Sequence, residues 1–158
     1  MHYIIDANNL AGRLKILDKK NFDLELIEVV RNYFGEKKHR VDLIFDGRDN
    51  MGDKRSEGSL NIIYTPRDSY YIGADDKIVE MVNSDLEGLE HGHVFVITDD
   101  LELIERVQKV AEKIQIIKVS DFAKNILLKL EVEELELEEE LSEEEENEIT
   151  REMFGIWK

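Results

Sequence analysis

Four aspartates in this sequence stand where short apolar runs come to an end. They are Asp6, Asp46, Asp75 and Asp100. Asp6 ends the first run, Asp46 and Asp100 follow later runs, and Asp75 follows the run at 60–65 after a loop. If these runs are parallel strands, their carboxyl ends share one edge of a sheet, where open α/β proteins place their chemistry. The sequence therefore predicts that the four carboxylates converge.

Four converging carboxylates repel one another, and this repulsion destabilises the fold unless something compensates it. A hard divalent cation such as Mg²⁺ or Mn²⁺ is the natural compensation, because it prefers oxygen ligands and shares them with substrate phosphate. Such an ion activates a water near neutral pH and neutralises the charge that develops on a phosphodiester. The predicted reaction is hydrolysis of a phosphodiester bond.

Ligand types other than oxygen are limited by the composition. The chain has no cysteine and four histidines, so a metal must be held by oxygen or imidazole. The histidines lie near the predicted strand starts, away from the acidic edge, and are not expected to be catalytic. They are His2, His39, His91 and His93.

Each aspartate taken alone also has a structural interpretation, because Asp after a strand is common as a helix cap or turn former. The joint placement of all four favours the metal site. Asp76 and Asp99 stand beside two of them. Each is interpreted as a further metal ligand, a support for the ligands, or simply a carboxylate in the first turn of a helix.

The elements that position these residues follow from apolar periodicity. Short apolar runs predict strands near 3–6, 41–45, 60–65, 94–98 and 114–119. Helical spacing predicts helices near 22–34, 74–82, 101–111 and 120–130. Residues 46–59 are expected to be a loop and 83–92 a turn-rich connection. The alternation predicts an α/β fold, a three-layer α/β/α domain with a mainly parallel sheet.

The chain length predicts one domain, 1–130, followed by an acidic tail, 131–158. The tail has 13 acidic and two basic residues, a net charge of −11 out of −16, which leaves −5 for the first 130 residues. Its Glu-rich part predicts either a solvated helix or a disordered segment. The apolar residues at 149–158 either dock on the body or on a second copy in a homodimer, or they fray.

No apolar run approaches the roughly 20 residues of a membrane span. The N-terminus also lacks the basic region, apolar stretch and cleavage site of a secretion signal. We therefore expect a cytoplasmic protein without a membrane partner.

Five short motifs, in this order and spacing, resemble the NYN domain, and more narrowly the YacP-like branch of the PIN-like ribonucleases. They are Ile4-Ile5-Asp6-Ala7-Asn8-Asn9, Phe45-Asp46-Gly47, Tyr64-Thr65-Pro66, Ala74-Asp75-Asp76-Lys77-Ile78 and Val96-Ile97-Thr98-Asp99-Asp100. The similarity covers about residues 3 to 123 and implies a PIN-like fold with metal-dependent endoribonuclease activity.

The resemblance also implies roles for single residues. Asp6, Asp75 and Asp100 match the metal-binding acids of the family. Asn9 matches its polar residue after the first strand, and Asp46 matches the acid of its Phe-Asp-Gly segment. The chain departs from the family pattern at Ala7, where Gly is usual, at Asp76, where Glu is frequent, and in its acidic tail.

RNA contacts are expected from loops at the same edge, with single-stranded RNA as the partner. The candidates are basic residues for phosphates and tyrosines for stacking on unpaired bases. They are Arg13, Lys15, Arg48, Lys54, Arg55, Arg67, Tyr70 and Tyr71. The alternative for each is an ordinary solvated loop position.

Two other functions compete with the nuclease. A phosphatase of the haloacid dehalogenase type is discounted, because it requires an acid two residues after its nucleophilic Asp, and that position is Asn8. A non-catalytic module that binds RNA or protein has little reason to hold four repelling carboxylates. The tail keeps this second alternative open, either as an autoinhibitory strip over the basic loops or as a contact for a basic partner such as a ribosomal surface.

Overall fold

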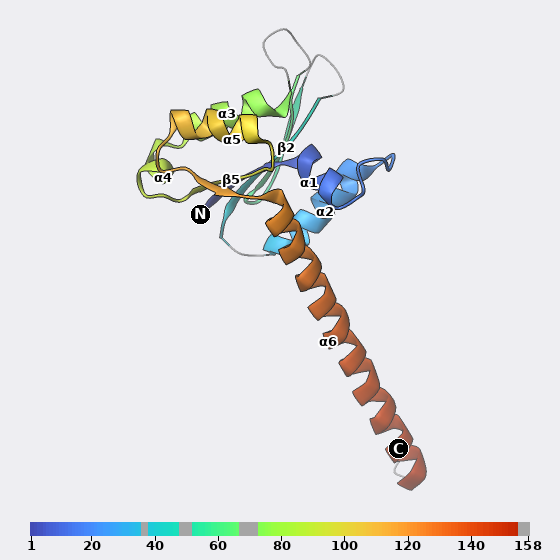
Figure 1. The fold of residues 1–158 in the computed structure, drawn as a ribbon. Coiled ribbons are helices and arrows are strands. Elements are labelled where there is room, and N and C mark those ends of the chain that lie inside the picture. Colours follow the sequence, from blue (N-terminus) through green and yellow to red (C-terminus); the bar gives the residue numbers. More distant parts are fainter. Residues whose placement is uncertain (36–37, 48–51, 67–72, 155–158) are drawn as a thin grey trace. The chain divides into compact units, whose positions relative to one another are not determined.

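The computed structural model describes residues 1–35, 38–47, 52–66 and 73–154, with side chains through residue 139. The chain divides into two compact units, Met1–Ala123 and the residues from Lys124 onward (Figure 1). The first unit contains the sheet and every candidate site residue that the structure describes.

Within the described residues, six strands form one sheet in the order β3-β4-β2-β1-β5-β6. The strands are β1 (His2–Asp6), β2 (Arg40–Phe45), β3 (Asp53–Glu57), β4 (Leu60–Tyr64), β5 (Val94–Ile97) and β6 (Gln115–Ile117). Neighbouring strands are parallel except β3 and β4. The predicted, mainly parallel sheet is confirmed.

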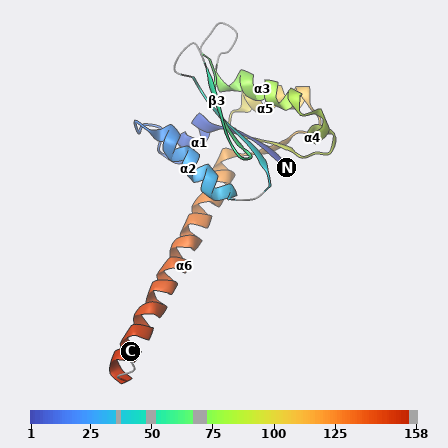
Figure 2. The same ribbon diagram turned by 180° about the vertical axis from the view of Figure 1, so that it is seen from behind.

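Strand β3 corrects one expectation, because it lies within residues 46–59, which were predicted to be a loop. It pairs antiparallel with β4 and forms an edge of the sheet (Figure 2). Its side chains are polar and mostly exposed, so the strand has no apolar alternation to show in the sequence. Edge strands that are charged on both faces are therefore missed by apolar pattern alone.

Six helices accompany the sheet in the described part of the chain. They are α1 (Ala7–Arg13), α2 (Phe22–Phe34), α3 (Ala74–Ser84), α4 (Leu86–Glu90), α5 (Leu101–Val110) and α6 (Val119–Phe154). Helix α4 lies where only turns were expected. Figure 1 shows α3 and α5 together on one face of the sheet and α1 and α2 on the other, which confirms the three-layer prediction.

The core explains why these layers form. On one face, Ile4, Ile44 and Ile63 of adjacent strands pack with Ile78 of α3 and Leu103 of α5 in one buried cluster. Replacing one such fully buried isoleucine by alanine typically costs about 2–5 kcal/mol. On the other face, aromatic rings join the sheet to α2. Tyr3 lies 5.1 Å from Phe34, and Phe45 lies 6.1 Å from Phe22, between ring centroids.

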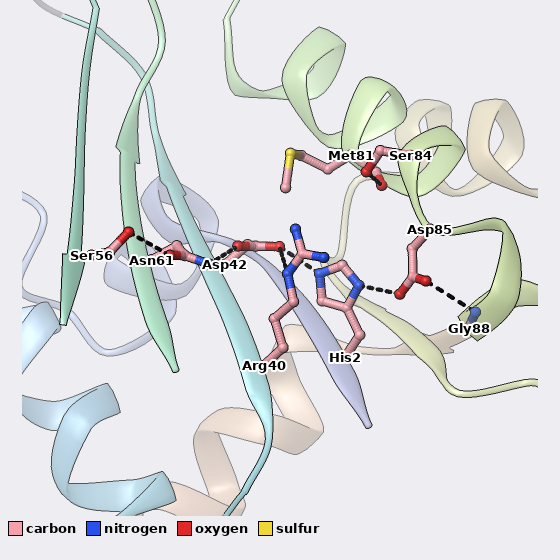
Figure 3. A network of polar contacts seen from close by, with 9 residues as sticks. All are labelled: His2, Arg40, Asp42, Ser56, Asn61, Met81, Ser84, Asp85 and Gly88. Carbon is pink, nitrogen blue, oxygen red and sulfur yellow. Dashed lines mark hydrogen bonds and ion pairs between the residues drawn. The ribbon is translucent and has the colours of Figure 1, made fainter. Parts of the chain in front are cut away.

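A polar network crosses the sheet at the amino end of the parallel strands (Figure 3). Asn61 of β4 donates to Asp42 of β2 at 2.8 Å. His2 of β1 lies between two carboxylates, with Nε2 on Asp42 and Nδ1 2.8 Å from Asp85. Asp85 in turn accepts the Gly88 N–H at 3.0 Å and so caps α4. The network therefore ties three strands and α4 together.

Helix α6 begins in the first unit, where the Phe122 ring lies 5.1 Å from Tyr33 and 6.0 Å from Phe34. It continues through residue 130 without a break, so the domain boundary predicted there stays a prediction. The Glu-rich tail is helical up to Phe154. Among the residues that the structure describes, no helix combines the length and apolar character needed to cross a membrane.

Candidate active site

The turn after β1 is the centre of the site. Strand β1 lies between β2 and β5, both parallel to it, and its last residue is Asp6. Helix α1 begins at the next residue, Ala7, and its buried Leu10 and Ala11 fix the helix against the core. Asp6 is thereby held at the carboxyl edge of the sheet, and the first turn of α1 carries Asn8 and Asn9 beside it.

A pocket of about 360 Å³ opens at this edge. Its walls are Asp6, Asn8, Asn9, Asp46, Gly73, Ala74, Asp75 and Asp100. We call it the acidic pocket. It unites the ends of β1 and β2 with the first turn of α3 and the residue before α5. The five residues predicted to be catalytic all line it, and their catalytic role stays a prediction.

Two asparagine side chains fix the neighbouring segments to the β1 turn. Asn8 Oδ1 accepts the Asp46 N–H at 3.0 Å, and Asn9 Oδ1 accepts the Asp99 N–H at 2.9 Å. The carboxyl ends of β2 and β5 are thus held against the same turn. The role of Asn8 was missed in the sequence, where an amide beside Asn9 has no distinguishing pattern.

Thr98 is a second residue that sequence reasoning missed. It is fully buried, and its hydroxyl donates to Asp6 Oδ2 at 3.1 Å while accepting the Asp100 N–H at 3.1 Å. Asp100 Oδ1 also accepts the N–H groups of Glu102 and Leu103 and so caps α5. Thr98 therefore sets the position of Asp6 relative to Asp100, and Asp100 is a helix cap as well as a pocket residue.

Asp46 fixes the start of α3. Its Oδ1 accepts the Ala74 N–H at 2.6 Å. A Cβ at Gly73 would lie 2.6 Å from the same oxygen, and Gly73 has a φ of 138°, so only glycine fits there. The glycine thus lets Asp46 approach the helix that carries Asp75.

The electrostatics of the pocket are unfavourable to its own carboxylates. Burial raises the pKa of Asp6 to about 7, with a further rise from the charge of Asp75, while the Thr98 hydroxyl opposes both. Burial raises the pKa of Asp75 to about 6, helped by Asp100 and Asp46 and opposed by Arg106. The pocket's own donors thus do not fully compensate the burial and mutual repulsion of its carboxylates.

A hard divalent cation fits this donor set. In the side-chain arrangement of the described residues, no three His, Asp or Glu groups already converge on one point. Mg²⁺, however, is usually held by one or two carboxylates together with waters and substrate phosphate, without an all-protein cage. Asp6, Asp75 and Asp100 supply such carboxylates, and their mutual repulsion is what a cation would relieve.

Two of the predicted metal ligands, Asp76 and Asp99, are not among the residues that line the acidic pocket. Asp76 Oδ1 accepts from Arg106 Nη2 at 2.9 Å. Asp99 Oδ1 accepts the Ser120 N–H at 3.3 Å, in the first turn of α6. Asp76 also lies in the first turn of α3. Whether each residue is a metal ligand, a support for the ligands or only a carboxylate of a helix start stays a prediction.

The predicted RNA contacts are spread over several segments. Arg13 ends α1 and Lys15 follows it, both exposed. Lys54 and Arg55 lie on the exposed edge strand β3, where Arg55 Nε is 3.6 Å from Glu57. The remaining predicted contacts lie outside the described residues. They are Arg48, Arg67, Tyr70 and Tyr71.

Comparisons with known proteins agree with this architecture. A crystal structure of a mutant of Rae1 (YacP) from Bacillus subtilis is similar with a TM-score of 0.60 at 18% sequence identity, covering 90% of this chain and 82% of that chain. That likeness shows a shared PIN-like fold. A search of curated proteins finds no match.

The sequence matches the YacP-like NYN domain over residues 3–154. The resemblance read from the five motifs is thereby confirmed, and the match continues through the acidic tail, beyond residue 123. NYN domains have a PIN-like ribonuclease fold, so the match supports an RNA nuclease function in general. Because it spans nearly the whole sequence, the chain belongs to the family of the YacP-like NYN domain.

Proposed function

We propose that this chain is an endoribonuclease that depends on a divalent metal and hydrolyses phosphodiester bonds of single-stranded RNA. The observation that carries the proposal is the gathering of four carboxylates, Asp6, Asp46, Asp75 and Asp100, in one pocket at the carboxyl edge of the sheet. The raised pKa values of Asp6 and Asp75 support it, because the fold keeps these acids together at an electrostatic cost.

In this proposal Asp6, Asp75 and Asp100 hold Mg²⁺ or Mn²⁺. When bound, such an ion lowers the pKa of a water molecule and neutralises charge that develops on the phosphate. The Thr98 hydroxyl keeps Asp6 oriented through its hydrogen bond to Oδ2. Asp46 holds the amino end of α3 at the pocket through the Ala74 N–H.

The amino ends of two helices add to the site. The first residue of α3, Ala74, lines the acidic pocket, and Asp100 directly precedes α5. The positive ends of both helix dipoles therefore point at the region where carboxylates and phosphate would gather. This partial positive charge favours the ionised form of the acids and the binding of an anionic substrate.

Cleavage of a labelled single-stranded RNA tests the proposal, in Mg²⁺, in Mn²⁺ and in EDTA. We expect cleavage by the wild type only with metal, and a loss of about 100-fold or more for Asp6→Asn and Asp100→Asn. Asparagine is also a good helix cap, so Asp100→Asn keeps the start of α5 intact. Asp18→Asn, at an exposed position outside the pocket, is the matched control and should retain full activity.

The opposite result is equally informative. A folded wild type that cuts no RNA with either metal contradicts the enzymatic proposal. That outcome favours the alternative, a non-catalytic module that binds RNA or protein.

A further inference from the structure

A second pocket, of about 340 Å³, shares helix α3 with the acidic pocket. Ile63 of β4, Pro66 and Met81 of α3 give it apolar walls, and its charged lining consists of two lysines, Lys54 and Lys77, and one carboxylate, Asp53. We call it the apolar pocket. Its composition differs from that of its neighbour, whose walls are mainly carboxylates and amides.

The two pockets share helix α3. Ala74 lines the acidic pocket, and Lys77, three residues later, lines the apolar pocket. A hydrogen bond also joins the two linings, since the N–H of Gly47, the residue after Asp46, donates to Thr65 Oγ1 at 3.1 Å, and Thr65 lines the apolar pocket. An RNA strand with a phosphate in the acidic pocket can therefore continue along α3 past the apolar pocket.

The apolar pocket is built on a rigid base. Ile63 is 4% and Met81 8% exposed, and both belong to the hydrophobic core. Gly52, directly before β3, lies close to the end of β4. A Cβ there would lie 2.9 Å from Pro66 Cδ and 3.0 Å from the Tyr64 carbonyl oxygen, and the φ of Gly52 is 35°. The pocket thus depends on a close backbone approach that glycine permits.

Two ammonium groups accompany these apolar walls. Lys54 is exposed and forms no ion pair within the described part of the chain. The Lys77 ammonium lies 3.1 Å from Glu80 and is 24% exposed. A ligand that matches this arrangement has a flat apolar part for the core side chains and an anionic part for the lysines. One nucleotide unit of an RNA strand has both.

We propose that the apolar pocket receives one nucleobase of the RNA, next to the bond that is cut, while Lys54 and Lys77 contact the adjoining phosphates. The inference rests on the proposed function, since it assigns a subsite to that RNA substrate. The base packs on Ile63 and Pro66 and against the thioether of Met81, which makes favourable contacts with aromatic rings.

Methyl NMR of the full chain with ¹³C-labelled methionine tests this subsite without any cleavage. The probes are uridine and adenosine 5′-monophosphates in Mg²⁺, which have no phosphodiester bond to cut. Met81→Leu assigns the Met81 methyl signal. We expect a saturable shift of that signal, because an aromatic base lies against it, and no shift of Met1, which lies outside the pocket.

Two controls separate the base from the phosphate. Ribose 5-phosphate has no base and should leave the Met81 signal in place. The double variant Lys54→Ala/Lys77→Ala should weaken nucleotide binding about tenfold, since two phosphate contacts are lost. The matched control Lys19→Ala/Lys109→Ala removes two exposed lysines, each paired with a glutamate, and should bind like the wild type.

An unmoved Met81 signal at millimolar nucleotide overturns the subsite, as does an equal shift with ribose 5-phosphate. If such a protein still cuts RNA, the proposed nuclease function stands and only the subsite fails. A saturable shift in a protein that cuts no RNA supports the base site and contradicts the nuclease proposal.

Discussion

Strand β1 carries two ionisable residues on the same face of the sheet, His2 at its start and Asp6 at its end. They lie about 13 Å apart along the strand, at the rise of about 3.3 Å per residue. Around His2, the pKa of the buried Asp42 is lowered: burial raises it, but hydrogen bonds from His2 and Asn61 outweigh that effect. Around Asp6, burial and the charge of Asp75 outweigh the hydrogen bonds from Thr98 and the Asn9 backbone, and the pKa rises to about 7.

The difference lies in the donors, since both edges bury carboxylates. The amino edge supplies the imidazole of His2, the Asn61 amide and Arg40, whose Nε lies 3.5 Å from Asp42. The acidic pocket supplies the Thr98 hydroxyl and a set of further carboxylates. A buried polar cluster that satisfies its own charges serves the fold, whereas one that leaves them unsatisfied indicates a site for an external cation.

The largest expected effect on stability comes from disrupting the polar network around His2 and Asp42 at the amino edge of the sheet. Asp42→Ala leaves the buried His2 and the half-buried Asn61 without their shared acceptor and should lower the free energy of unfolding by about 3–5 kcal/mol. Denaturant titration measures this loss. Asp18→Ala, at an exposed position, should change stability by less than about 0.5 kcal/mol. If Asp42→Ala is as stable as Asp18→Ala, the network has no structural role.

Removing the charge of Asp6 in the acidic pocket should instead raise the free energy of unfolding. A folded pKa of about 7 for Asp6, above its ordinary 3.8, means that the folded state binds the proton more tightly. Stability in EDTA therefore falls as pH rises from about 4 to 8. For Asp6 alone the loss is up to about 4 kcal/mol, and the coupled Asp75 makes this an upper bound.

The Asp6→Asn variant isolates this contribution. It should be more stable than the wild type at pH 8 in EDTA and similar near pH 4, where Asp6 is protonated in the folded wild type and about half protonated in the unfolded chain. Thermal unfolding across the pH range measures the difference. Both proteins should still lose stability as the pH falls below 4. Asp42 and Asp85 have lowered pKa values, and their stabilising contribution disappears as they become protonated. Equal pH profiles above pH 4 would contradict the assignment.

A smaller effect is expected from the residue that orients Asp6. Thr98→Val removes the hydroxyl that joins Asp6 to the Asp100 N–H and should lower kcat for RNA about tenfold, with little change in KM. Thr98→Ser keeps the hydroxyl and should restore most of the rate. A Ser variant as slow as the Val variant would assign Thr98 to packing alone.

The smallest effect is expected from the tail. Removing residues 131–158 takes away a net charge of −11 and should raise the affinity for RNA several-fold at low salt, with a smaller gain at high salt. Fluorescence anisotropy with labelled RNA measures it. Unchanged affinity at low salt would contradict an autoinhibitory role. It would favour the alternative that the tail binds a basic partner.

The acidic pocket was predictable because its acids follow a simple rule. Asp6, Asp46 and Asp100 end or follow parallel strands, and parallel strands place their carboxyl ends at one edge. Thr98 and Asn8 were not predictable, since their roles depend on single hydrogen bonds across the fold. Strand β3 was missed because an exposed edge has no apolar pattern.

The network around His2 was missed for a related reason. His2 meets Asp42 and Asp85 across 40 and 83 residues of sequence. No local pattern marks such long-range partners. The sequence correctly placed His2 away from the acidic edge, but its buried contacts required the fold.

Calorimetric titration of Mg²⁺ and Mn²⁺ into the metal-free full chain at pH 7.5 tests the central claim most directly. We predict saturable binding with proton release, because Asp6, with its pKa raised to about 7, is partly protonated near this pH. The released protons make the measured heat vary with the ionisation enthalpy of the buffer. Asp6→Asn should bind at least about tenfold more weakly. A folded wild type that binds neither ion, or an Asp6→Asn variant that binds equally well, would contradict the claim that the acidic pocket is built for a cation.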